Sequence, residues 1–116
     1  MNIDKYFTRK YDANNYNCAH FVCEVWEDLY GVDIRHKLLP LLQPLDKRAA
    51  PFNLRRNFER LAAPVEPCFV LMHRRHCDAH VGLYIHGKVF HINDIRVELA
   101  PLKIVSIGFD SIGFYR

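Results

Sequence analysis

The sequence of 116 residues has no apolar stretch long enough to cross a membrane, and its first residues lack the apolar segment of a signal peptide. We therefore expect a protein that is made in the cytoplasm and does not enter a membrane. The formal charge is only +3, and the basic residues lie in scattered pairs, so no nucleic-acid-binding surface is predicted. Repeats, linkers and low-complexity segments are also lacking. The chain is expected to be one folded domain over residues 1–116.

The sequence also lacks the cysteine pattern of a small disulfide-bonded protein. Its four cysteines are expected to be reduced, and each is then a core residue, a loop residue or a chemical group. They are Cys18, Cys23, Cys68 and Cys77.

Apolar periodicity is helical in the first half of the chain and strand-like in the second. The first half predicts a helix that ends before Gly31, a short helix between residues 31 and 44, and a helix over 51–61. The second half has short apolar runs that predict strands over 68–72, 80–85, 89–92, 95–99, 104–107 and 112–115. Helices followed by an antiparallel meander indicate an α+β fold.

Cys18 falls in the first turn of the first predicted helix, directly after an asparagine-rich run over residues 14–17 that favours turns and helix caps. Unpaired backbone N–H groups at a helix start favour an anion, so a thiol there is shifted toward thiolate. A lone cysteine is nevertheless more often a small core residue. The chemical interpretation therefore depends on what the rest of the chain can bring to it.

A tight turn of sequence His-Gly-Lys joins two of the predicted strands. If this turn holds an even number of residues, His80, Gly82 and Tyr84 lie on the same sheet face as His91 and Asn93. His91 then lies opposite Gly82 or Tyr84, depending on the register, and Gly82 would leave space beside the imidazole. Two histidines on one face, one orienting the other, are what a nucleophile, base and orienting group require.

Cys18 at a helix start, followed by Phe21-Val22, together with the stretch from His80 to His91 resembles the NlpC-type cell-wall peptidases. The resemblance extends over most of the chain and implies a papain-like fold, in which the catalytic cysteine begins a helix packed on an antiparallel sheet. It implies a catalytic triad of Cys18, His80 and His91 and hydrolysis of amide bonds in peptidoglycan stem peptides. No cofactor and no metal are expected.

The same resemblance places the tyrosine that helps the oxyanion hole at Tyr11, with Tyr16 as the alternative. The backbone N–H of Cys18 is the other expected donor. His20, in the first turn of the helix, is expected to be a solvated surface residue, with contact to substrate as the alternative. Asn93 competes for the third place in the triad.

One motif departs from the family. Typical members read Asp-Cys-Ser-Gly, whereas this chain reads Asn17-Cys18-Ala19-His20. In the family the Asp and Ser help to hold the amine end of the peptide, so their replacement keeps the nucleophile but changes the usual substrate position. Thioester, lipid-acyl or deamidation chemistry on the same scaffold is the alternative. A stand-alone member without a signal resembles those of phages or delivered effectors, which implies delivery to the periplasm or cell wall and a phage-virion or immunity partner.

A competing, non-enzymatic hypothesis comes from residues 73–80, which hold four potential zinc ligands, His73, His76, Cys77 and His80. A zinc-dependent nucleic-acid-binding module would use this stretch. Structural zinc usually requires two separated ligand pairs, and no second cluster lies at a suitable distance in the sequence. The hydrolase is therefore the preferred hypothesis.

Overall fold

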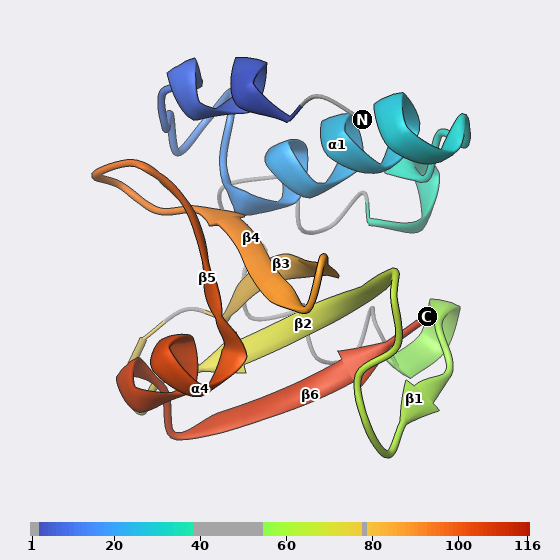
Figure 1. Cartoon of the computed structure of the whole chain (residues 1–116), viewed down its shortest axis with the longest axis vertical. Helices are drawn as coiled ribbons and strands as arrows, with labels where there is room; N and C mark the ends of the chain where they lie inside the picture. Colours follow the sequence, from blue (N-terminus) through green and yellow to red (C-terminus); the bar gives the residue numbers. More distant parts are fainter. Residues whose placement is uncertain (1–2, 39–54, 78) are drawn as a thin grey trace.

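Helix α1 lies against one face of an antiparallel sheet, over strands β3 and β4 (Figure 1). This arrangement comes from a computed structural model that describes residues 3–38, 55–77 and 79–116. Six strands form the sheet in the order β1-β6-β2-β3-β4-β5, and every neighbouring pair is antiparallel. The predicted α+β class is confirmed. The elements are η1 (Asp4–Thr8), α1 (Cys18–Tyr30), η2 (Arg35–Lys37), β1 (Arg60–Leu61), β2 (Cys68–His73), β3 (His80–Ile85), β4 (Lys88–Ile92), β5 (Val97–Pro101), α4 (Leu102–Val105), η4 (Ser106–Gly108) and β6 (Ser111–Tyr115).

Local capping explains why α1 begins at Cys18. The buried Asn17 side chain accepts hydrogen bonds from the backbone N–H groups of Ala19, at 2.9 Å, and His20, at 3.3 Å. The Nδ1 atom of His20 accepts in return from the Asn17 backbone N–H at 3.1 Å, which completes a capping box. At the other end Gly31 takes a left-handed conformation with a φ of 71°, a common helix stop. Both predicted ends of this helix are confirmed.

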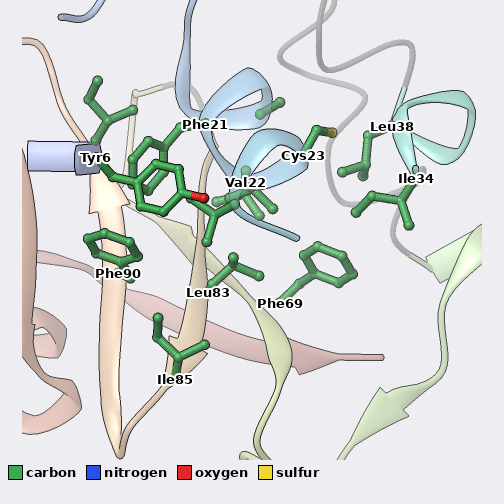
Figure 2. Close-up of a cluster of buried hydrophobic side chains, with 14 of the residues drawn as sticks. Tyr6, Phe21, Val22, Cys23, Ile34, Leu38, Phe69, Leu83, Ile85 and Phe90 are labelled. Carbon is green, nitrogen blue, oxygen red and sulfur yellow. The ribbon is translucent and has the colours of Figure 1, made fainter. Parts of the chain in front are cut away.

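The main core fills the space between α1 and the sheet (Figure 2). Phe21 of α1 meets Phe90 of β4 edge to face, with ring centroids 5.0 Å apart. Tyr6 of η1 contacts both rings edge-on and donates from its hydroxyl to Asp28 Oδ2 at 2.5 Å. Because one face of β3 and β4 is buried under the helix, alternate residues of these strands are fully or nearly fully buried. These residues are Val81, Leu83, Ile85, Phe90 and Ile92.

A smaller apolar cluster covers part of the opposite face of the sheet. It contains Val70, Met72 and Val89, with Val105 of α4 packed against them. The strand predicted over residues 104–107 is therefore wrong, because this stretch is the end of α4 followed by η4. Leu102 and Val105, three residues apart, pack on the sheet in a helical pattern that a short run of apolar residues does not reveal.

Two other predicted elements differ in extent. The helix predicted over 51–61 is helical at residues 55–57, whereas 60–61 form strand β1 against β6, and 51–54 lie outside the described residues. The short helix predicted between 31 and 44 corresponds to η2, and its part from residue 39 onward also lies outside them.

The strand predicted over 95–99 begins two residues later, at Val97, because residues 93–96 form a turn. Among the described residues, no helix has the length and apolar character needed to span a membrane.

Candidate active site

The hairpin of β3 and β4 sets the geometry of the site. Its turn has two residues, both with left-handed backbone, at φ 52° and 71°, as in the tight turns that suit twisted hairpins. Leu83 pairs with Phe90, so the same register continued by one residue places His91 opposite Gly82. The turn therefore holds an even number of residues, which is the condition that the sequence analysis set for a shared face. His80 and His91 consequently share one face of the sheet.

The two imidazole rings are in direct contact. His80 Nε2 lies 2.8 Å from His91 Nδ1, a hydrogen-bond distance. His91 is only 4% exposed, and this burial lowers the pKa of its ring, an effect that the nearby Glu98 carboxylate partly opposes. Burial therefore favours the neutral form of the His91 imidazole.

Glu98 of β5 lies on the other side of the His91 ring. The two residues pair directly across β4 and β5, and Glu98 Oε2 is 3.4 Å from His91 Nε2. Arg96 Nε donates to the other carboxylate oxygen, Oε1, at 3.0 Å. Within the described part of the chain, the buried His91 Nε2 atom makes no hydrogen bond. The Glu98 carboxylate lies within ion-pair distance of this atom.

Cys18 and the two histidines line a single cavity of about 960 Å³. His80 is the first residue of β3 and His91 the second-last of β4, so both lie at the end of the hairpin away from its turn. Tyr11 and Asn93 line the same cavity. Cys18, His80 and His91 are thus brought to one cavity from two distant parts of the sequence.

Two of the predicted site residues lie elsewhere. The hydroxyl of Tyr16 donates to Glu24 Oε1 at 2.6 Å, and burial with this bond raises the pKa of Tyr16 well above its usual value. His20 uses its Nδ1 atom in the α1 capping box. Neither side chain lines the cavity, so the two alternatives, Tyr16 in the oxyanion hole and His20 in contact with substrate, lose their support.

Asn93 serves the turn between β4 and β5. Its side-chain oxygen accepts from the backbone N–H groups of Ile95, at 2.8 Å, and Arg96, at 2.9 Å. His91 Nδ1 lies at hydrogen-bond distance from His80 Nε2, whereas the Asn93 side-chain oxygen is used by the turn, which favours His91 for the third position.

The cysteines differ in accessibility. Cys23 and Cys68 are fully buried, and burial raises the pKa of Cys23 to about 12 and raises that of Cys68. Cys77 is exposed and lines the cavity, whereas Cys18 is half-buried. No sequence signal places Cys77 at this cavity.

Three further residues around the histidines were not predicted. Glu98 stands out in the sequence only as a charge within an apolar strand. The Phe109 ring lies parallel to that of His80, with 6.0 Å between centroids, and the Arg74 guanidinium lies 5.4 Å from the Phe109 centroid. Neither Phe109 nor Arg74 has a sequence signal that links it to His80.

The outer wall of the cavity is apolar. The three most exposed large hydrophobic side chains among the described residues are Ile95, Ile107 and Ile104, at 82%, 81% and 60%, and all three line it. Exposed apolar side chains that gather beside reactive groups indicate a binding surface for an apolar part of a ligand.

The potential zinc ligands of residues 73–80 do not gather. Considering only residues 3–38, 55–77 and 79–116, no three His, Cys, Asp or Glu side chains come close enough together to hold a metal ion. His80 is paired with His91 instead.

Comparisons with known proteins leave the resemblance untested. No protein-family model, curated protein or solved structure matches this chain. A functional proposal for the chain therefore rests on the geometry of its own residues.

Gly82 provides a test of how closely the hairpin packs. A Cβ atom at this position would lie 3.1 Å from carbon atoms of His91, Met72 and Val89. Gly82→Ala should therefore lower the free energy of unfolding by about 1–3 kcal/mol, measured by urea denaturation. Gly108→Ala is the control, because the nearest atom to its added Cβ is 3.8 Å away. Equal stability of Gly82→Ala and wild type would contradict the packing.

The accessibility of the cysteines allows a second test. Accessibility alone would favour modification of Cys77 over the half-buried Cys18. A thiolate at the start of α1 should nevertheless make Cys18 the first residue alkylated by limiting iodoacetamide at mildly acidic pH. Peptide mapping by mass spectrometry identifies the modified residue. Earlier labelling of Cys77 would contradict an activated Cys18.

Proposed function

We propose that this chain is a cysteine hydrolase of papain-like type, in which Cys18 is the nucleophile, His80 the base and His91 the orienting residue. The observation that carries the proposal is the 2.8 Å contact between His80 Nε2 and His91 Nδ1 in the cavity that Cys18 also lines. A base held in place by a third group beside a nucleophile is the arrangement that acyl transfer requires.

The proposed reaction has two steps. The Cys18 Sγ atom attacks the carbonyl carbon of an amide, its proton passes to His80, and His80 then protonates the leaving amine as the C–N bond breaks. In the second step His80 removes a proton from water, which attacks the thioester. The C–S bond breaks, the proton on His80 returns to the Cys18 sulfur, and the carboxylic acid leaves.

Two donors would stabilise the negative oxygen of the tetrahedral intermediates. The backbone N–H of Cys18 is one, and the hydroxyl of Tyr11, which lines the cavity, is the other. Each such donor typically lowers the barrier by about 3 kcal/mol. Tyr11 is preferred over Tyr16 because the hydroxyl of Tyr16 donates to Glu24 outside the cavity.

Peptidoglycan stem peptides are the proposed substrate, on the strength of the resemblance to NlpC-type peptidases. Incubation of purified peptidoglycan with the protein should release fragments that mass spectrometry identifies. Cys18→Ala and His80→Ala should each reduce the rate at least about a thousandfold with little change in melting temperature. His91→Ala should reduce it less, and His91→Asn should recover part, because an amide oxygen can accept a hydrogen bond from the Nε2–H of His80.

His86→Asn is the matched control for the histidine variants. His86 is exposed in the turn at the far end of the hairpin, and asparagine tolerates its positive φ. Its variant should keep full activity. Full activity of Cys18→Ala would contradict the proposal.

A second candidate function is favoured by the apolar wall of the cavity. Ile95, Ile104 and Ile107 suit an apolar acyl group better than the polar residues of a stem peptide. The residues before and after Cys18 also differ from those that hold the peptide amine in the family. Hydrolysis of acyl esters or thioesters through Cys18 is this alternative.

A series of p-nitrophenyl esters separates the two candidates. If the substrate is apolar, kcat/KM should rise with chain length from acetate to octanoate, and Ile107→Ser should lower it for octanoate but not for acetate. Val32→Ser is the control, because Val32 is an exposed aliphatic residue outside the cavity lining. Cys18-dependent hydrolysis with no preference for long chains would leave the peptidase as the better candidate.

A further inference from the structure

We infer that Glu98 is a positioning residue that selects the ring tautomers of His91 and, through it, of His80. The inference deepens the proposed function, because it concerns how His80 would be kept ready to accept a proton. It rests on one line of contacts across three strands: Glu98 Oε2 to His91 Nε2 at 3.4 Å, and His91 Nδ1 to His80 Nε2 at 2.8 Å.

A neutral imidazole carries one N–H, so the pair of rings can be hydrogen-bonded in two ways. In the first, His91 is protonated on Nε2 and its Nδ1 atom accepts from the Nε2–H of His80. In the second, His91 is protonated on Nδ1 and donates to His80, and its Nε2 lone pair then faces the Glu98 carboxylate.

The carboxylate distinguishes these two arrangements. It attracts an N–H on His91 Nε2 and repels a lone pair there. His91 is 4% exposed, and water therefore screens this difference less than it would at the surface. The first arrangement is thus favoured, and it puts the His80 proton on Nε2.

The first arrangement is also the only one of the two that leaves His80 basic at Nδ1. With Nε2 protonated, the lone pair of His80 is on Nδ1, which can accept a proton from a thiol. In the second arrangement Nδ1 of His80 carries the proton and cannot act as a base. Glu98 thus supports His80 without touching it.

Two features hold Glu98 in this role. The strand register pairs it directly with His91, so its side chain is on the same face of the sheet. Arg96 Nε donates to Oε1 at 3.0 Å, which leaves Oε2 turned toward His91. A change at Glu98 should therefore act through the rings and not through the folding of β5.

Long-range ¹H–¹⁵N correlation spectra of the histidine side chains test the inference directly, because they distinguish protonated from unprotonated ring nitrogens. The wild type should show both His80 and His91 protonated on Nε2. Glu98→Met, which has similar length and no acceptor, should shift His91 toward the Nδ1–H form. Glu98→Gln, which keeps an acceptor oxygen, should remain closer to the wild type.

Glu66→Gln is the matched control. Glu66 also has a histidine partner, with its Oε1 atom 3.7 Å from His86 Nδ1, but this pair lies outside the cavity lining. Its variant should leave the His80 and His91 signals unchanged. In the hydrolysis assay Glu98→Met should lower kcat on the order of tenfold or more, with partial recovery in Glu98→Gln.

The spectra separate this inference from the proposed function. An Nδ1–H tautomer of His91 in the wild type, or unchanged tautomers in folded Glu98→Met, would overturn the role of Glu98 whatever the activity. Expected tautomers together with an unreactive Cys18 would leave the role of Glu98 intact and would contradict the hydrolase.

Discussion

The contact between His80 and His91 is the interaction on which the candidate site depends. It requires a turn of even length, so that both rings lie on one face, and Gly82 opposite His91, where an added Cβ would lie 3.1 Å from the His91 Cβ atom. The same hairpin buries its other face under α1 through Phe90 and Leu83. Packing of the helix on the sheet and alignment of the histidines are therefore two consequences of one strand register.

Much of this arrangement could be predicted from local signals. The asparagine-rich run before Cys18 and Gly31 after Tyr30 mark the two ends of α1, and the structure confirms both. The alternation of His80, Gly82 and Tyr84 indicated one face of β3, but whether His91 shares that face depended on the length of the turn, which the structure shows to be two residues. These signals are reliable because each depends on a few neighbouring residues.

Features set by distant contacts could not be predicted in this way. Glu98 meets His91 only because the turn after Asn93 fixes the register of β5, and nothing in its own segment indicates that partner. Residues 104–107 resemble a strand in composition but turn back as α4 and η4, since Val105 packs on the sheet. In each case a tertiary contact overrides the local pattern.

The central claim is that Cys18 and His80 act as one unit, and their electrostatic coupling can be measured. The ultraviolet absorbance of the Cys18 thiolate can be followed as a function of pH in a Cys77→Ser background, where the buried Cys23 and Cys68 titrate at higher pH because burial raises the pKa of both thiols. Replacing His80 by glutamine should raise the pKa of the Cys18 thiol toward that of an ordinary cysteine. An unchanged pKa in folded His80→Gln would show that the two side chains are not coupled and would contradict the site.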